Sequence, residues 1–212
     1  MKRCVIIGGA DIGRYDRVNR LLHGDDFGIY CDCGLRHRER LNLPPGLIVG
    51  DFDSHPRPAT DTETIVLPRE KDDTDSVYAA KEAIRRGYDS FLLAGMVGGR
   101  LDHTLGNVAL LLYLDSMKKQ AVLVDDWSEM EIVSSEPKRI EDRYFCFSLI
   151  SLGGPAKGID IRNAKYPLTD GVIPSEYQYG ISNEVLPGRT ATVSVREGRL
   201  LLIRNLKEDS GA

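Results

Sequence analysis

The chain has no long hydrophobic run and no excess of positive charge, and each absence excludes a class of protein. Its 212 residues contain no apolar stretch near the roughly 18 residues that a membrane-spanning helix needs. The formal charge of −4 is unlike that of general nucleic-acid-binding proteins, which are usually basic. The apolar segment Cys4–Ile7 after the N-terminal Met1-Lys2-Arg3 is too short for a signal-peptide core. We therefore expect a cytoplasmic protein that binds neither membranes nor nucleic acid.

Cysteine is also scarce, with four residues in the chain. Cys31 and Cys33 form a C-x-C pair rather than the C-x₂-C of most zinc sites, and no second Cys/His pair has a matching spacing. Cys4 and Cys146 lie in apolar, strand-like runs and are expected in the core. The cysteines therefore predict neither a structural zinc nor, in a reducing compartment, a disulfide.

The first half of the chain alternates strand and helix patterns. Predicted strands cover Arg3–Ile7, Phe27–Cys31, Leu47–Val49 and Phe91–Met96, and predicted helices cover Arg14–Leu22, Asp75–Arg86 and His103–Lys118. This alternation predicts an α/β domain over residues 1–122, with an open, mostly parallel sheet and flanking helices. Ligands of such sheets bind beyond the carboxyl ends of the strands.

From about residue 121 the pattern changes to short strands separated by turns. They cover Ala121–Val124, Glu131–Ser134, Tyr144–Ser151, Gly158–Arg162, Thr190–Val195 and Leu200–Arg204. No convincing helix follows, so residues 123–212 are expected to form an all-β, sandwich-like domain.

Two carboxylates lie one residue apart beyond an apolar strand. Asp51 and Asp53 follow Leu47–Val49 and Gly50, and in an extended segment their side chains point to the same side. A hard cation such as Mg²⁺ relieves the repulsion between two such groups, and it usually pairs one or two carboxylates with substrate phosphates. A solvated acidic turn is the alternative.

A second acidic cluster, Asp72-Asp73-Thr74-Asp75, opens a predicted helix. Asp73 or Thr74 would suffice as the helix cap, and acidic residues in a first turn favour the helix dipole. Capping does not explain three carboxylates within four positions, which favours metal or ligand binding.

The segment Gly98–Thr104 joins a predicted strand to a predicted helix. Gly98 and Gly99 place a glycine turn before a helix N-terminus, which suits phosphate, and Arg100 adds a forked cationic donor. Asp102 could cap the helix or hold metal, and Asn107 suggests a polar contact one turn later. Together with the acidic clusters, this segment suits Mg²⁺-assisted transfer of a phosphoryl-type group.

The segment Gly8–Tyr15 is a near miss for a P-loop. It has G-x-x-x-x-G, followed by Arg14-Tyr15 where Lys and Ser or Thr are needed. A phosphate-binding loop and a plain glycine turn both fit this segment.

Several motifs, in order, resemble the thiamine pyrophosphokinase (thiamine diphosphokinase) family over nearly the whole chain. They are Cys31–Gly34, Gly46–Ser54, Lys71–Asp75, Gly98–His103 with Asn107, Asn163–Leu168 and Gly180–Glu184. The resemblance implies an α/β catalytic domain that binds ATP and Mg²⁺, and a β-sandwich domain that binds thiamine and forms a homodimer. It implies transfer of the diphosphoryl group of ATP to the hydroxyethyl oxygen of thiamine, with release of AMP.

The resemblance also implies roles for individual residues. Asp51, Asp53 and Asp75 would hold Mg²⁺, with Asp102 nearby as a fourth catalytic carboxylate. Nucleotide contacts would come from a larger set: Asp32, Asp72, Asp73, Thr74, Gly98, Gly99, Arg100 and Asn107. Tyr166, Ser182 and Asn183 would contact thiamine, and the Tyr166 ring can stack on a pyrimidine or face a cationic thiazolium.

Two positions depart from the family pattern. Members often have Asp-Gly-Gly where this chain has Asp32-Cys33-Gly34, and some have Trp where Tyr166 stands. The other activities that fit the motifs are diphosphoryl transfer to another alcohol, such as a hydroxymethyl pterin, and a non-catalytic sensor of a nucleotide or thiamine diphosphate.

Overall fold

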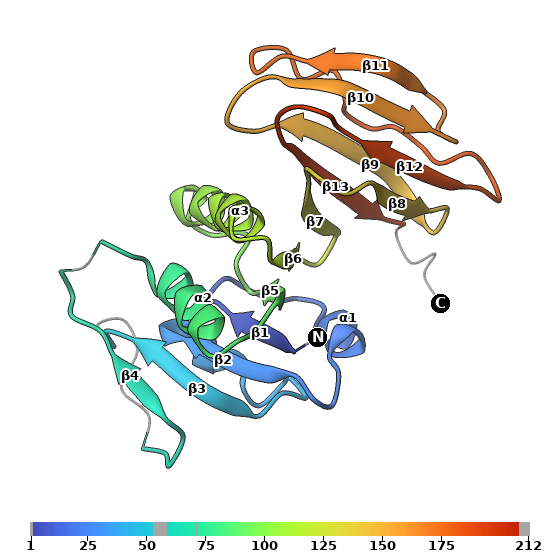
Figure 1. The fold of residues 1–212 in the computed structure, drawn as a ribbon. Helices are drawn as coiled ribbons and strands as arrows, with labels where there is room; N and C mark the ends of the chain where they lie inside the picture. Colours follow the sequence, from blue (N-terminus) through green and yellow to red (C-terminus); the bar gives the residue numbers. More distant parts are fainter. Residues whose placement is uncertain (1, 53–58, 71, 208–212) are drawn as a thin grey trace. The chain divides into compact units, whose positions relative to one another are not determined.

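The structure is a computed structural model that describes residues 2–52, 59–70 and 72–207. The chain divides into two units, Met1–Asp126 and Trp127–Ala212 (Figure 1). The first unit combines a parallel sheet with helices, and the second is built from antiparallel strands. Both agree with the fold class predicted from the sequence. The division follows Asp126, where residue 122 was expected.

Six strands of the first unit form a sheet in the order β4-β3-β2-β1-β5-β6, and each neighbouring pair is parallel. The strands are β1 (Arg3–Ile7), β2 (Phe27–Cys31), β3 (Pro45–Gly50), β4 (Thr64–Val66), β5 (Ser90–Ala94) and β6 (Gln120–Val124). The helices are α1 (Tyr15–Leu21), α2 (Asp75–Arg85) and α3 (Leu101–Ser116), with a 3₁₀ helix η1 (Asp32–His37) directly after β2.

The order of these strands indicates the edge of the sheet at which ligands are expected to bind. From β1 the chain adds β2, β3 and β4 on one side, and it later adds β5 and β6 on the other. The strand order therefore reverses between β1 and β5, and ligands of open α/β sheets bind at the carboxyl ends around such a point. Helix α2 packs against β1, β2 and β3, so its first residue lies near this edge.

Local sequence explains the ends of α2. Thr74 caps the helix, and its hydroxyl oxygen accepts a hydrogen bond from the Val77 N–H at 3.4 Å. At the other end Gly87 has a φ of 85°, which a glycine adopts without strain, and its N–H donates to the Ile84 carbonyl at 2.9 Å. Helix α2 therefore forms as the sequence predicts.

Other elements differ from the prediction. Helix α3 begins at Leu101 rather than His103, which places Asp102 inside the first turn. The elements η1 and β4 were not predicted, because one is a single short 3₁₀ segment and the other has three residues. Strand β6 was expected among the short strands of the second half, but it pairs parallel to β5 and belongs to the first unit.

The second unit has two antiparallel groups of strands. One has the order β7-β13-β9 and the other β11-β10-β12-β8. The strands are β7 (Ser128–Val133), β8 (Lys138–Glu141), β9 (Tyr144–Ser151), β10 (Ala156–Arg162), β11 (Leu168–Ile173), β12 (Thr190–Ser194) and β13 (Leu200–Leu206). Their core includes Phe147, Leu149, Ile159 and Val193, all fully buried. The predicted sandwich-like domain is confirmed, whereas β8 was not predicted.

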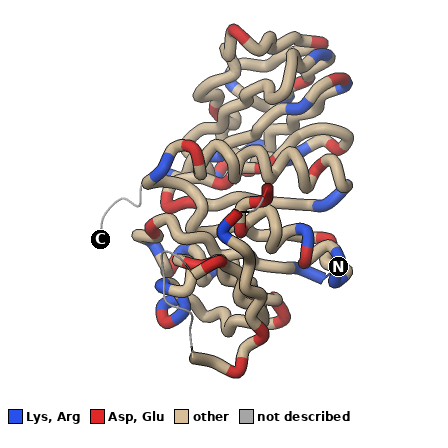
Figure 2. Tube along the Cα trace, turned by 90° about the vertical axis from the view of Figure 1, so that its left-hand side faces the viewer, with Lys and Arg blue, Asp and Glu red and all other residues tan. Residues whose placement is uncertain are grey.

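Buried cysteines and mixed surface charge agree with the composition. Cys4 and Cys146 are buried, as expected for small core residues. Acidic and basic positions are interspersed along the trace (Figure 2). In the part of the chain that the structure describes, none of the helices is long and apolar enough to cross a membrane.

Candidate active site

Three carboxylates from separate elements lie near one another at the carboxyl edge of the first sheet. Asp32 follows β2, Asp51 follows β3 and Asp75 begins α2. Burial raises the pKa of Asp32, and the negative charges of Asp75 and Asp51 raise it further, against a hydrogen bond from Cys33. We call Asp32, Asp51 and Asp75 the edge acids, because the charges of Asp51 and Asp75 act on Asp32 although the sequence separates them.

The backbone brings the edge acids close at some conformational cost. Asp32 has a φ of 34° and Phe52 a φ of 55°, values that side-chain-bearing residues rarely adopt. Gly50 lies against Asp32, since a Cβ atom at residue 50 would stand 3.0 Å from the Asp32 Cβ. Strained residues cluster at functional sites, and here one of them is the edge acid Asp32 and the other, Phe52, directly follows the edge acid Asp51.

The edge acids supply the oxygen ligands that a divalent cation prefers, but the structure does not hold the oxygens of these three described residues within 4.8 Å of one another. Asp32 is only 9% exposed, and among the described residues its buried Oδ1 atom has no hydrogen-bond partner. A buried carboxylate oxygen without a partner is costly, and two further negative charges nearby add to that cost. A hard cation with oxygen ligands, such as Mg²⁺, relieves both. Asp53, predicted as a further ligand, lies outside the described residues.

The other acidic residues near α2 are arranged differently. Asp73 forms an ion pair with Lys81 at 2.7 Å, and Thr74 caps the helix. Asp72 is exposed. The structure therefore brings Asp75, but not the whole acidic cluster, to the edge acids.

Asn107 links three elements at the same edge. Its Oδ1 accepts a hydrogen bond from the Ser76 hydroxyl at 2.9 Å, and its Nδ2 donates to the Met96 carbonyl at 2.9 Å. The side chain thus ties the first turn of α2 and the segment just after β5 to α3. This polar contact explains why a weak helix former occupies the second turn of α3.

The glycine turn before α3 is open. Gly98 has a φ of 106° and Gly99 a φ of 66°, and no atom would lie within 4 Å of a Cβ at either position. Arg100 and Asp102, which we call the turn pair, form an ion pair at 2.6 Å with both side chains exposed. The hydrogen bond from Arg100 lowers the pKa of Asp102 to about 2. Asp102 therefore lies with Arg100 rather than with the edge acids.

In the glycine turn after β1, backbone N–H groups already donate hydrogen bonds to other groups of the protein. The N–H groups of Gly8 and Ala10 donate to the carbonyls of Ala94 and Gly95 at 2.9 and 2.8 Å. The N–H of Gly13 donates to an Asp126 carboxylate oxygen at 2.9 Å. With these amides occupied, the segment is a structural glycine turn, and the phosphate-binding reading of it is not supported.

One further contact fastens this turn to η1. His37 is buried; its Nε2 donates to the Ala10 carbonyl at 2.9 Å, and its Nδ1 accepts from the Tyr15 hydroxyl at 2.6 Å. Burial lowers the pKa of His37, which suits the neutral ring that this pair of bonds requires. Gly34 packs against β1, since a Cβ there would lie 2.3 Å from the Ile7 carbonyl oxygen. Because Asp32 is the first residue of η1, these contacts fix its position relative to β1.

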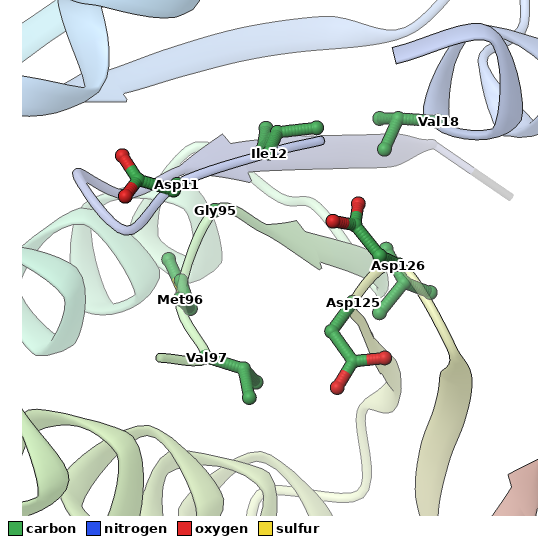
Figure 3. Close-up of a pocket in the computed structure, with 9 residues that line it drawn as sticks. Asp11, Ile12, Val18, Gly95, Met96, Val97, Asp125 and Asp126 are labelled. Carbon is green, nitrogen blue, oxygen red and sulfur yellow. The ribbon is translucent and has the colours of Figure 1, made fainter. Parts of the chain in front are cut away.

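A small hollow lies between this turn and the ends of β5 and β6 (Figure 3). It has a volume of about 220 Å³, part of it open to solvent, and its lining includes Ile12, Met96, Asp125 and Asp126. Asp126 points toward the β1 turn that it binds. Sequence reasoning missed His37 and Asp126. The position of Asp126 just after a strand was a usable signal, whereas nothing local marks His37.

Another group of possible metal ligands lies at the opposite ends of the strands, just before β2. Ligand atoms of His23, Asp25 and Asp26 lie within 4.8 Å of one another. Asp26 already accepts hydrogen bonds from Arg3 at 2.6 and 2.7 Å, and the other two are exposed. This group therefore closes the loop between α1 and β2 and does not compete with the edge acids.

In the second unit, the buried side chain of Asn183 binds the backbone of Tyr166, another residue predicted to contact thiamine. Asn183 is 6% exposed; its Oδ1 accepts from the Tyr166 N–H at 3.0 Å, and its Nδ2 donates to the Tyr166 carbonyl at 2.8 Å. The Tyr166 side chain is 60% exposed. Ser182 has a φ of 59°, and its N–H donates to the Ser148 hydroxyl at 3.0 Å. Asn183 thus holds the Tyr166 backbone while the ring stays exposed.

Comparisons with known proteins agree across both units. Residues 18–124 match the family described as "Thiamin pyrophosphokinase, catalytic domain", and residues 133–200 match "Thiamin pyrophosphokinase, vitamin B1 binding domain". Thiamine pyrophosphokinase of Bacillus subtilis (strain 168) is 31% identical over 144 residues, which cover 66% of each protein.

Solved structures show the same fold. The structure of thiamine pyrophosphokinase from Bacillus subtilis matches with a TM-score of 0.84 at 23% identity, over 98% of this chain and 100% of that one. The structure of thiamin pyrophosphokinase from Geobacillus thermodenitrificans matches with a TM-score of 0.83 at 28% identity, over 98% and 99% of the chains. With its catalytic and vitamin B1 binding domains both matched in order, the chain belongs to the thiamin pyrophosphokinase family.

Proposed function

We propose that the protein transfers the diphosphoryl group of ATP to the hydroxyethyl oxygen of thiamine, forming thiamine diphosphate and AMP. The observation that carries this proposal is the position of the edge acids near one another at the carboxyl edge of the sheet, in a chain of this family. The reaction needs charge neutralisation and in-line placement of the attacking and leaving oxygens more than it needs covalent chemistry from the protein.

The edge acids are the residues that we propose hold Mg²⁺. When bound, the ion would neutralise oxygens of the ATP tail. Asp32, which the sequence suggested as a nucleotide contact, joins Asp51 and Asp75 in this role because of its buried Oδ1 atom and its raised pKa. A role for Asp53 stays a prediction.

The open glycine turn would receive the nucleotide phosphates. The space over Gly98 and Gly99 lets phosphate oxygens approach the backbone, and Arg100 can exchange its exposed partner Asp102 for phosphate. The helix N-terminus beside this turn adds favourable dipoles. Nucleotide contacts by Asp72, Asp73, Thr74 and Asn107 stay predictions.

The second unit would hold the acceptor. An exposed Tyr166 ring offers a face to the thiamine rings, and a cationic ring is favourable there. Ser182 would contact the same molecule. Asn183 would act as a positioning residue through the Tyr166 backbone, because its amide already binds that backbone on both sides.

We also propose that the protein works as a homodimer. Large apolar side chains stand exposed on both units, which supports an interface with a second copy. They include Leu101 and Leu105 on α3, and Tyr177, Tyr179 and Ile181 in the second unit. Sedimentation or light scattering that gives the mass of one chain at working concentration would contradict the dimer. The cytoplasmic location stays a prediction from the sequence.

An acceptor comparison tests the reaction. The pure protein is incubated with ATP, Mg²⁺ and either thiamine or a hydroxymethyl pterin, and AMP and the diphosphorylated product are measured. We expect AMP and thiamine diphosphate in equal amounts, and product only with thiamine. Product with the pterin alone would assign another acceptor, and calorimetric binding of ATP and thiamine without product would indicate a sensor.

A further inference from the structure

Thr74, Ser76 and Asn107 form a chain of hydrogen bonds around an edge acid. The Ser76 hydroxyl oxygen lies 3.1 Å from the Thr74 hydroxyl oxygen and 2.9 Å from Asn107 Oδ1. At the other end, Asn107 Nδ2 donates to the Met96 carbonyl at 2.9 Å. Asp75 lies between Thr74 and Ser76 in the sequence, so both of its neighbours belong to this chain of hydrogen bonds.

The position of each proton in this chain of hydrogen bonds follows from its two ends. A carbonyl oxygen can only accept, so the amide nitrogen of Asn107 faces Met96 and its Oδ1 faces Ser76. The Ser76 hydroxyl must then donate to Oδ1, and its oxygen accepts from the Thr74 hydroxyl. The Thr74 oxygen accepts in turn from the Val77 N–H. Each side chain thus has a defined donor and acceptor role, and a network of this kind makes the side chains more rigid.

Asp75 needs such support because its surroundings oppose its position. Its negative charge acts on the Asp32 carboxylate, as does that of Asp51. Repulsion between like charges favours a displacement of Asp75, and the ends of helices fray easily. The hydrogen bonds of Asn107, on α3, instead tie the first turn of α2 to the segment just after β5.

We propose that Ser76 and Asn107 are positioning residues, which act through the backbone of Asp75 to hold its carboxylate at the proposed cation site. Asn107 contributes in this way rather than by touching the nucleotide, since its amide oxygen and nitrogen already bind Ser76 and the Met96 carbonyl. This role rests on the proposed function, because that function assigns Asp75 to the cation.

Binding of Mn²⁺ in place of Mg²⁺ tests the positioning role without turnover. The pure protein is titrated with MnCl₂, and the free ion is measured by electron paramagnetic resonance. We expect Ser76→Ala to raise the Kd for Mn²⁺ about 10-fold, because loss of a residue that orients a metal ligand commonly has an effect of this size. Ser76→Thr keeps the hydroxyl and should retain the affinity.

Ser116→Ala is the matched control for the loss of a serine hydroxyl. The Ser116 hydroxyl donates to the Tyr113 carbonyl at 2.6 Å at the other end of α3, away from the edge acids. Its removal should leave the Kd for Mn²⁺ unchanged.

A double-mutant cycle tests whether the two positioning residues act as one unit. Asn107→Ala should also weaken Mn²⁺ binding, and the addition of Ser76→Ala should weaken it little further, because the chain of hydrogen bonds is already broken. In an active preparation, both single variants should raise the Mg²⁺ concentration that gives the half-maximal rate. The KM for ATP at saturating Mg²⁺ should hardly change. A higher KM for ATP in Asn107→Ala alone would overturn the positioning role of Asn107 and assign it to the nucleotide.

Three results of the binding experiment would overturn the proposal. They are an unchanged Mn²⁺ affinity in folded Ser76→Ala, fully additive losses in the double variant, and no saturable Mn²⁺ binding by the unmodified protein. Circular dichroism checks folding, and equal losses in Ser76→Thr and Ser76→Ala would show that the hydroxyl is not responsible. If Mn²⁺ binding follows the expected pattern but no thiamine diphosphate forms, the positioning role stands and the proposed reaction fails.

Discussion

The edge acids and the turn pair are two acidic regions of one unit with opposite electrostatic surroundings. Asp32 is almost fully buried, and burial and like charges raise its pKa. Asp102 is exposed, and Arg100 lowers its pKa to about 2. Both residues follow parallel strands of the same sheet, at positions where ligands bind. The difference shows that the neighbours of an aspartate matter more than its place in a motif. They decide whether a cationic side chain already balances its charge, as at Asp102, or a bound cation is needed to do so, as at Asp32.

The largest expected effect comes from removing an edge acid. Asp75→Asn should lower the rate of thiamine diphosphate formation by about 10²-fold or more, because a charge that holds the cation is lost. Folding should be unharmed, since the change also relieves repulsion with Asp32. Asp89→Asn is the matched control, because Asp89 pairs with Lys119 and lies just before β5, at the opposite end of the strand from the edge acids. Equal rates in the two variants would contradict the distinction between the edge acids and an acidic residue that is held in an ion pair.

A smaller effect is expected at the turn pair. Arg100→Ala should raise the KM for ATP roughly 10-fold, because a charge-assisted contact to phosphate is lost. Stability should hardly change, since exposed ion pairs contribute little. Steady-state kinetics at varied ATP and at varied thiamine separate the two substrates. A rise in the thiamine KM alone would contradict a contact between Arg100 and the nucleotide.

The smallest effect concerns the dependence of stability on pH. The folded pKa of Asp32 lies above its unfolded value of 3.8, so its favourable contribution is complete below that value and is lost as pH rises through the folded pKa. Asp102 has the opposite sign: its contribution is present above 3.8 and is lost as pH falls through about 2.

Unfolding by denaturant in the absence of divalent ions measures the sign of each residue's contribution to stability. At neutral pH, Asp32→Asn should be more stable than the unmodified protein, and Asp102→Asn slightly less stable. Both differences should shrink as pH falls. A destabilised Asp32→Asn under these conditions would show that Asp32 has a compensating partner, which would weaken the comparison.

Much of the fold and part of the site follow from local sequence. The strands β1, β2 and β9 have the predicted bounds because each is a continuous apolar or alternating run. Asp51 and Asp75 could be proposed as metal ligands because motifs beside a strand end and a helix start mark them.

The remainder depends on pairs of residues that are distant in the chain. Asp32 joins the other edge acids only because β2 lies beside β3, and the turn after β1 is closed by Asp126, more than a hundred residues away. His37 acts through Ala10 and Tyr15, which no local pattern connects. The ion pair of Arg100 with Asp102, two positions apart, could have been anticipated from the sequence.

The central claim is that the edge acids hold a divalent cation, and the stabilisation of the fold by Mg²⁺ tests it most directly. Unfolding by denaturant is measured without and with MgCl₂ for the unmodified protein, Asp32→Asn, Asp75→Asn and Asp102→Asn. At a concentration 100-fold above its Kd, Mg²⁺ should raise the unfolding free energy of the unmodified protein and of Asp102→Asn by about 2.7 kcal/mol. It should raise that of the two edge-acid variants far less. Equal stabilisation of all four proteins would contradict the account.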